Sequence, residues 1–356
     1  MNRSNKWLQG AVASCALVLV ACGSSSTGTG GGPKTGTLHM AFVYATTSQN
    51  PFQEMALGAA AGAADAGDVD LTETAPPSIN GPQEVSQFQA AVRTARDGVA
   101  METLTPDLFV RPLQQAAAAG VPLATVDTVP PAGAKVELYV GNDNTELGRS
   151  LATEIIKQIP VGTTGEVVLG NDIPGLDLLS QRLDGMKAVL QEQRPTLTVL
   201  GPFDTGSEPT DNYNKWNNTV KAHPDAVAYL GAGASDAVSL SLIQKNTGRR
   251  MLVGSCDPDA QALIGVKDGY VAALASPEHW LKGYIAIRLL AEHARTGKPL
   301  TQGWWNPGGL IINAANIDDI IARQQNDQSR RQWFADAAAR QLADPGSYLR
   351  PLADAK

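Results

Sequence analysis

From residue 38 onward, short apolar runs alternate with stretches in which apolar residues recur every three or four positions. The first run, 38–44, has the length of a strand, and apolar residues then recur at helical spacing from Phe52 to Ala63. Gly67 follows, and glycine commonly ends helices. This alternation predicts strand–helix–strand units, which build parallel sheets with helices on both faces. Further strands are predicted at 122–126, 136–140, 166–169, 196–200, 226–230, 251–254 and 271–275.

The amphipathic stretches between these strands predict helices. One is centred on Phe88 and is predicted to end near Gly98, and another covers 108–119. The clearest apolar stripe covers 176–190 in the second half of the chain. Beyond residue 314 the pattern becomes more polar, and 324–340 is predicted to form an additional C-terminal helix.

The repeated strand–helix rhythm fills a chain of 356 residues, which is long for one core and natural for two lobes. We therefore expect the α/β class, with two doubly wound parallel-sheet lobes. In open parallel sheets, ligands bind beyond the C-terminal ends of the strands. Polar residues at those ends are the first place to look for chemistry.

The N-terminus has the pattern of an export signal. Arg3 and Lys6 precede an apolar run over 11–21, and no acidic residue occurs before Glu54. A bilayer-spanning helix needs ~20 apolar residues, so this run is too short to be one. Residues 1–21 are therefore predicted to be a signal peptide that is removed.

The apolar run ends in Leu19-Val20-Ala21-Cys22, which resembles a bacterial lipobox. The resemblance implies a diacylglycerol on the Cys22 thiol, and therefore a lipid anchor on the extracytoplasmic face of the membrane. Residues 22–36 are rich in Gly, Ser and Thr, so they are predicted to form a flexible tether. The alternative is an ordinary secretory peptide in which this cysteine is incidental.

Charge and cysteine content exclude some partners. The formal net charge is −7, which argues against nucleic acid or an anionic membrane surface as the main partner. Cys15 lies in the predicted signal peptide and Cys22 is predicted to be acylated, so Cys256 cannot form an intramolecular disulfide. A lone cysteine can be a nucleophile, but a small buried side chain is the more common role.

The sequence contains none of the common enzyme motifs considered below. The segment Gly231-Ala232-Gly233 begins like a dinucleotide fingerprint, but Asp236 stands where the third glycine should be. There is no phosphate-binding loop, no nucleophile elbow and no His-Glu-x-x-His sequence, and the four histidines are scattered. We therefore expect no catalytic residues, no cofactor and no metal.

Polar side chains gather where the predicted strands end, with one aromatic residue among them. Carboxylates and amides bind hydroxyl groups, and an aromatic ring packs on the C–H face of a sugar. The alternative is that these residues only cap the helices that follow. The candidates for ligand contact are Asn50, Phe52, Asp127, Thr128, Asn144, Ser180, Asp236 and Asp257.

Over roughly 37–314, the chain resembles the type I periplasmic binding proteins, in particular the ribose-binding-like sugar receptors of ABC importers. The resemblance rests on six short motifs in order. They are Asn50-Pro51-Phe52, Val126-Asp127, Asp143-Asn144-x-x-x-Gly148, Ala222-His223-Pro224-Asp225-Ala226 before Ser235-Asp236, Val253-Gly254-x-x-Asp257, and Pro277-x-x-x-x-x-Gly283-Tyr284.

The resemblance implies a lobe of residues 37–142 with 276–306 and a second lobe of 143–275 with 307–330. A three-strand hinge would join them, and 331–356 would be a C-terminal extension. It also implies that a sugar or polyol binds between the lobes and is delivered to an ABC transporter permease, with no chemistry performed by this protein. We expect the protein to act as a monomer.

Three positions depart from the family pattern. The family's sugar-binding Arg would fall near Ser180, with Arg182 two residues on, and Ala275-Ser276 replace the Gln expected before Pro277. An aromatic residue expected in the second lobe has several candidates. They are Phe203, Tyr213, Trp304 and Trp305.

Two other functions stay open at this stage. The same cleft could serve a receptor for a sugar-like autoinducer or a chemotactic sugar. A less favoured possibility is an extracytoplasmic hydrolase that uses Cys256 or a pair of acids, although no base or oxyanion hole is evident beside Cys256.

Overall fold

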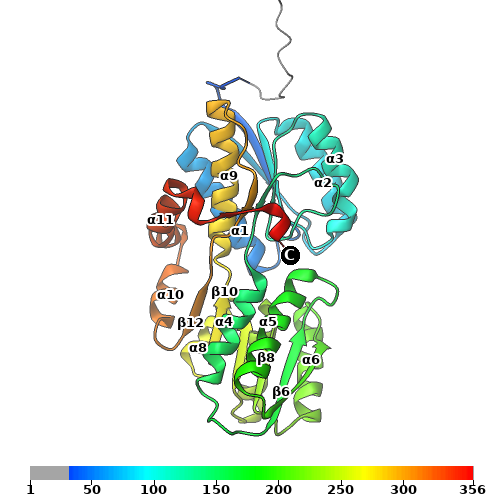
Figure 1. Ribbon diagram of the computed structural model, residues 1–356, viewed down its shortest axis with the longest axis vertical. Coiled ribbons are helices and arrows are strands. Elements are labelled where there is room, and N and C mark those ends of the chain that lie inside the picture. Colours follow the sequence, from blue (N-terminus) through cyan, green and yellow to red (C-terminus); the bar gives the residue numbers. More distant parts are fainter. Residues whose placement is uncertain (1–31, 356) are drawn as a thin grey trace, which may run out of the picture.

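The computed structural model describes residues 32–355. The predicted signal peptide, Cys22 and most of the predicted tether lie outside the described residues. Within them, two α/β lobes are stacked along the long axis of the molecule, each built on its own sheet (Figure 1). The predicted α/β class with two lobes is confirmed.

The sheet of the first lobe has seven strands in the order β13-β11-β5-β4-β3-β1-β2. All neighbouring strands are parallel except β11 and β13, which are antiparallel. Its strands are β1 Leu38–Val43, β2 Val69–Thr74, β3 Gly98–Met101, β4 Leu123–Val126, β5 Leu138–Val140, β11 Gly303–Trp305 and β13 Leu349–Arg350. Apolar clusters on both faces bury this sheet beneath α1 (Asn50–Ala66) and α9 (His279–Thr296) on one side, and α2 (Gly81–Thr94) and α3 (Val110–Ala118) on the other.

The sheet of the second lobe has six strands in the order β12-β10-β9-β8-β6-β7, parallel except for β12. Its strands are β6 Gly165–Asn171, β7 Leu197–Asp204, β8 Ala228–Gly231, β9 Val253–Cys256, β10 Ala273–Ser276 and β12 Leu310–Asn313. One face is covered by α4 (Asn144–Ile156) and α5 (Asp177–Gln193). The other is covered by α6 (Pro209–Ala222), α7 (Ala234–Thr247), α8 (Ala260–Lys267) and α10 (Ile317–Arg323).

The chain passes between the lobes where β5 leads into α4, where β10 leads into α9, and where β11 leads into β12. These are the three predicted crossovers. A fourth passage follows, which the sequence pattern did not predict. It leads from α10, which packs on α8, to α11 (Asp327–Ala343), which packs on α9 (Figure 1).

The C-terminal segment is an integral part of the first lobe. Phe334 of α11 stacks on Trp280 of α9 with ring centroids 5.0 Å apart, and Arg330 pairs with Glu54 of α1. Helix α11 begins at Asp327, so the expected extension at 331–356 starts inside a helix rather than at a boundary. The last strand, β13, then closes the edge of the first sheet beside β11.

Two differences from the predicted elements have clear reasons. The sequence pattern does not predict strand β2, because its residues are mostly polar and, as the edge strand of the sheet, it is largely exposed. The pattern predicts a helix that ends near Gly98, but α2 ends at Thr94 and Gly98 begins the buried strand β3. A side chain at Gly98 would meet Leu290 of α9 at 3.1 Å, which explains a glycine inside a strand.

Glycine residues bring one helix pair of each lobe into backbone contact. A Cβ added at Gly283 of α9 would lie 1.9 Å from the carbonyl oxygen of Met55 on α1. In the second lobe, a Cβ at Gly148 of α4 would lie 1.8 Å from the carbonyl oxygen of Arg182 on α5. Only glycine permits these approaches, and they determine where α9 and α5 present their side chains.

We predict that Gly283→Ala lowers the free energy of unfolding by about 3 kcal/mol, because the added methyl group must displace backbone rather than a flexible side chain. Gly36→Ala is the matched control, since a Cβ there meets nothing within 4 Å, and it should change stability by less than about 0.5 kcal/mol. Urea unfolding of both variants tests this. Equal stability of the two would contradict the packing argument.

Candidate functional site

Two aspartates form the centre of the candidate site. Each directly follows a central strand of its sheet. Asp127 follows β4 in the first lobe, and Asp257 follows β9 in the second. Both adopt the left-handed backbone region, with φ of 64° and 61°, and both side chains are buried. Aspartate tolerates this region better than most residues, yet the conformation is strained, and such strain is concentrated at functional sites.

The two aspartates are connected by buried polar side chains. Lys282 of α9 forms an ion pair with Asp127, and its Nζ lies 3.3 Å from Nδ1 of His279. The other ring nitrogen of His279, Nε2, lies 2.8 Å from Oδ1 of Asp257. Oδ2 of Asp257 in turn accepts a hydrogen bond from Nη1 of Arg182 at 2.6 Å. This chain of contacts, hereafter the buried ion chain, runs from the first lobe to the second.

Each aspartate of the buried ion chain is held in its charged form. Burial by itself would raise the pKa of Asp257, but the Arg182 guanidinium and the hydrogen bond with His279 outweigh it, so the pKa lies well below the usual range. Burial likewise opposes ionisation of Asp127, and Lys282 with His279 lowers the pKa below its usual value. Two buried carboxylates are thus matched by two buried cations.

Arg182 makes three hydrogen bonds within the second lobe. Its Nε donates to Oδ1 of Asn144 at 3.0 Å, and its Nη1 donates to the carbonyl of Ala232 at 2.9 Å as well as to Asp257. Its Nη2 is buried and has no hydrogen-bond partner among residues 32–355. One donor of the site is therefore left for a bound molecule.

Ser180, a predicted ligand contact, lies outside the buried ion chain. Its hydroxyl donates to the carbonyl of Leu176 within its own helix at 3.3 Å, and its side chain is not part of the buried ion chain. Arg182, two residues on, supplies the guanidinium group that the family resemblance places near Ser180. The sequence contains an indication of this role. Arg182 lies on the apolar stripe between Leu179 and Met186, where a cation without a counter-charge would be costly.

Asp236 and Asp172 extend the polar edge of the second lobe. Oδ1 of Asp236 accepts hydrogen bonds from Thr205, Asn212 and Trp216, and its Oδ2 accepts from the backbone N–H of Gly233. Asp236 therefore fills the structural capping role weighed as the alternative, and its two oxygens are occupied by the protein. Oδ1 of Asp172 is buried and has no partner in the part of the chain that the structure describes.

The glycines near these acids explain the Gly231-Ala232-Gly233 sequence. A Cβ at Gly233 would lie 2.1 Å from Oδ2 of Asp172, and one at Gly231 would lie 2.2 Å from Cβ of Asp236. The glycines make room for two buried acids, which accounts for the partial likeness to a dinucleotide fingerprint.

The remaining predicted contacts have varied surroundings. Asn144 is buried beside Arg182, as described above. Asn50 begins α1 and is half-buried, whereas Phe52 is buried within the apolar cluster of the first lobe. Thr128 is half-buried and donates to the carbonyl of Thr103 at 2.8 Å. Their roles in ligand binding stay predictions.

The aromatic candidates Trp304 and Trp305 contribute to the hinge region instead of an open surface. Nε1 of Trp304 donates to the carbonyl of Gly141 at 2.6 Å, and Nε1 of Trp305 donates to Gln341 of α11 at 3.0 Å. Both rings are buried. Phe203 and Tyr213 are only partly buried, beside the apolar cluster beneath α6 and α7.

Cys256 does not have the environment of a nucleophile. The thiol is fully buried, and burial raises its pKa to about 12, so it is protonated at neutral pH. Within residues 32–355, no group of three or more His, Cys, Asp or Glu side chains is arranged to hold a metal ion. Over the same residues, no helix has the length and apolar character needed to cross a membrane.

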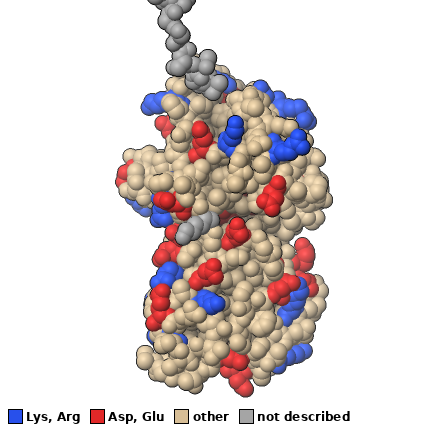
Figure 2. Space-filling view, turned by 45° about the vertical axis from the view of Figure 1, so that its right-hand side comes forward, with Lys and Arg blue, Asp and Glu red and all other residues tan. Residues whose placement is uncertain are grey.

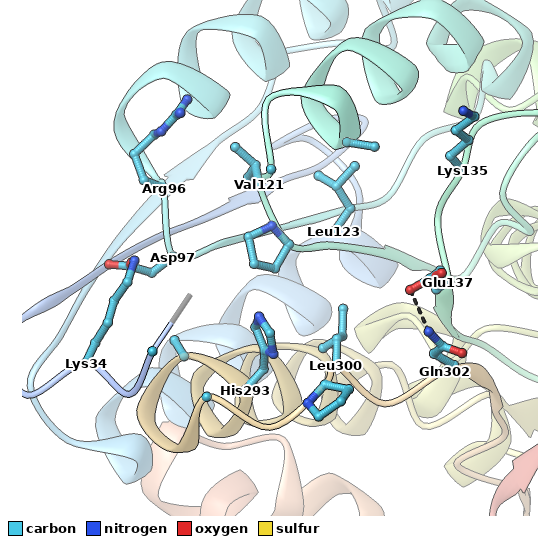
Figure 3. Close-up of a pocket in the computed structure, with 17 residues that line it drawn as sticks. Lys34, Arg96, Asp97, Val121, Leu123, Lys135, Glu137, His293, Leu300 and Gln302 are labelled. Atoms are coloured by element: carbon cyan, nitrogen blue, oxygen red, sulfur yellow. Dashed lines mark hydrogen bonds and ion pairs between the residues drawn. The ribbon is translucent and has the colours of Figure 1, made fainter. Parts of the chain in front are cut away.

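A cavity of about 670 Å³ lies at the other end of the first lobe (Figure 3). Its lining includes Leu123 at the start of β4, the ion pair of Lys34 with Asp97, and Glu137, which accepts a hydrogen bond from Gln302 at 2.8 Å. Two pairs of these polar side chains therefore satisfy one another, and the cavity is at the N-terminal edge of the sheet. The strand-end rule places ligands at the opposite edge, where the buried ion chain lies.

The face shown in Figure 2 has no extended patch of positive or negative charge, because basic and acidic residues are interspersed over both lobes. The outline narrows between the lobes on the right-hand side of that view. Charged residues with a specific arrangement are thus found inside, at the junction of the lobes.

Residues 40–299 match the family model described as a periplasmic binding protein domain, and the chain belongs to that family. The proteins that the chain resembles include several named for the sugars that they bind. Their names describe binding proteins and not enzymes.

Two curated relatives are similar over part of their length. The chain is 24% identical over 217 residues to a xylose/arabinose-binding protein of Sulfolobus acidocaldarius, covering 56% of this chain and 52% of the relative. It is 22% identical over 204 residues to a ribose import binding protein of Bacillus subtilis, covering 57% of this chain and 65% of the relative. The matches thus span less than two thirds of either relative.

Solved structures share the fold over most of the chain. An ABC transporter solute-binding protein from Burkholderia graminis, in complex with D-arabinose, matches with a TM-score of 0.73 and 19% identity, covering 80% of this chain and 98% of that one. One from Agrobacterium vitis, bound with α-D-tagatopyranose, matches with a TM-score of 0.72 and 22% identity, covering 81% and 98%.

We predict that Asp257→Asn lowers the free energy of unfolding at pH 7 by about 3 kcal/mol, because Arg182 loses its buried counter-charge. The folded pKa of Asp257 lies below its unfolded value, so the carboxylate stabilises the protein above about pH 4 and this contribution is lost as the pH falls below that value. The difference between variant and wild type should therefore shrink at acid pH.

Denaturant unfolding at pH 7 and pH 3 measures that difference. Asp225→Asn, at an exposed turn, is the matched control and should leave the free energy of unfolding unchanged at both pH values. A pH-independent difference for Asp257→Asn would contradict the assignment of a charged Asp257.

Proposed function

We propose that this protein captures a sugar or polyol between its lobes and delivers it to the permease of an ABC importer. The observation that supports this most directly is the pair of strained, buried aspartates, Asp127 and Asp257, at facing strand ends of the two lobes. A ligand that contacts both would stabilise the closed arrangement, as hinge-closing binding proteins do. The family and the sugar-binding relatives support the same class of ligand.

We further propose that the body works on the extracytoplasmic face of the membrane as a monomer, anchored through lipid on Cys22 and held by the tether 22–36. The permease would then be within reach of the tether, and ATP hydrolysis would take place in the transporter. This protein would bind and release its ligand without changing it.

Ligand binding is tested first by a thermal-shift screen of sugars, polyols and nucleosides. A ligand at 100 times its Kd stabilises the folded state by about 2.7 kcal/mol, which raises the unfolding temperature measurably. Calorimetry with the best ligand then compares wild type with Asp127→Asn. We expect a loss of affinity of at least about tenfold, because a charge-assisted hydrogen bond to a ligand hydroxyl is weakened.

Asp225→Asn, in the exposed turn before β8, is the matched control and should bind like wild type. Unchanged affinity of Asp127→Asn for the best ligand would remove Asp127 from the site. Absence of any stabilising sugar or polyol would count against the proposed class of ligand.

The lipid anchor is tested by fractionating cells that express the full chain. Cys22→Ser should move the protein from the membrane fraction to the soluble extracytoplasmic fraction, because the acylated thiol is lost. Cys15→Ser is the matched control, since it lies in the segment predicted to be removed, and it should leave the protein with the membrane. Membrane retention of Cys22→Ser would reject the anchor.

A further inference from the structure

Two glutamates at the C-terminal edge of the first sheet are not explained by the buried ion chain. Glu102 directly follows β3, and Glu84 lies in the first turns of α2, which begins at the same edge. Glu102 is fully buried and Glu84 is 2% exposed. Neither was singled out from the sequence.

Each glutamate uses one oxygen and leaves the other without a partner. Oε2 of Glu102 accepts from the backbone N–H of Ala45 at 3.0 Å, and Oε2 of Glu84 accepts from Oγ1 of Thr103 at 3.0 Å. The Oε1 atoms of both are buried and have no hydrogen-bond partner among the described residues. A buried polar atom without a partner is costly, and these two oxygens are therefore available to a hydrogen-bond partner from outside the protein.

The cations nearby are already engaged. The charged groups that act on Glu102 are Glu84 of α2, Asp127 after β4 and Lys282 of α9. Glu84 accepts a hydrogen bond from the hydroxyl of Thr103, and no salt bridge joins it to a cation within residues 32–355. Since Lys282 is bound to Asp127, and Arg182 to Asp257, neither glutamate has a counter-charge of its own.

A carboxyl group that is buried without a counter-charge retains its proton. Burial raises the pKa of Glu84 to about 8. Burial, followed by the neighbouring Glu84 and Asp127, raises the pKa of Glu102 well above its usual value. At neutral pH both groups are therefore mainly carboxylic acids, which can donate as well as accept a hydrogen bond.

We propose that Glu84 and Glu102 bind the ligand as neutral carboxylic acids through their free oxygens, and so restrict the cleft to uncharged polyhydroxyl compounds. This inference rests on the proposed function and refines its ligand class. A hydroxyl group matches the site because it can accept from a carboxylic acid or from Nη2 of Arg182 and can donate to Asp127. A sugar acid would bring a carboxylate to a site with no unpaired cation, and an amino sugar would require one glutamate to lose its proton.

Calorimetry at pH 6, 7 and 9 tests this with three probe classes: neutral sugars (D-xylose, D-arabinose, D-ribose), an acidic sugar (D-glucuronate) and an amino sugar (D-glucosamine). Wild type should bind at least one neutral sugar and bind the charged probes at least about tenfold more weakly. Its affinity for the neutral sugar should be constant from pH 6 to 7 and about tenfold lower at pH 9, because a required proton is lost above a pKa of about 8.

Glu84→Gln and Glu102→Gln reproduce the shape of the neutral acid, but the amide group has no proton that is lost between pH 6 and 9. Each should bind the neutral sugar within about threefold of wild type at pH 7, and the double variant should lose the decline at pH 9. Glu292→Gln is the matched control, exposed near the far end of α9, and should keep the wild-type profile. Far-UV circular dichroism confirms that each variant is folded at each pH.

Two results would overturn the inference while leaving sugar capture intact. One is a neutral sugar whose affinity is unchanged at pH 9 in wild type. The other is tight binding of D-glucosamine at pH 6 and 7 that is lost in Glu102→Gln, which would make the glutamates counter-charges for an ammonium group. If neither these probes nor any sugar or polyol of the thermal-shift screen binds folded wild type, the proposed function itself fails, and this inference fails with it.

Discussion

Backbone contact between paired helices determines where the polar site can form. Gly283 lets α9 approach the carbonyl of Met55 on α1, and Gly148 lets α4 approach the carbonyl of Arg182 on α5. These contacts leave no room for a Cβ, so each helix pair has one register and one separation. Lys282 precedes Gly283 on α9, and Arg182 supplies the contacted carbonyl on α5. Both cations thus point into the junction between the lobes because the helices that hold them are closely packed.

Once these cations are buried, the rest of the site follows from charge balance. A buried charge is tolerated only when it is paired and hydrogen-bonded, and Asp127 and Asp257 supply the partners at two facing strand ends. His279 lies between the two ion pairs and extends the contacts across the lobes. The buried polar atoms that have no partner among the described residues include Nη2 of Arg182, Oδ1 of Asp172 and Oε1 of each of the two glutamates of the first lobe. A ligand can shift the lobes toward closure only by interacting better with the closed form, and these free groups are where it could do so.

The sequence predicted most elements because apolar periodicity is strong in the buried strands and helices, and α1 ends at Gly67 as expected. It failed where that signal was weak or ambiguous. Strand β2 is an exposed, polar edge strand, and Gly98 resembles a helix stop although it permits close packing of Leu290. Helix α11 could be predicted from its pattern, but not its return to the first lobe, because the stack of Phe334 on Trp280 joins residues distant in the chain.

By itself, the sequence determined the α/β class, the two lobes and the strand-end positions of Asp127 and Asp257, because local periodicity and residue type are properties of neighbouring residues. It could not decide which polar residues share one site. Only the tertiary structure made Arg182 the guanidinium group expected near Ser180, occupied Asp236 with protein donors, and brought Lys282, His279, Glu84 and Glu102 to the same edge. The reason is physical: pairing of buried charges and protonation of buried acids depend on distances between segments far apart in the chain, which no local pattern specifies.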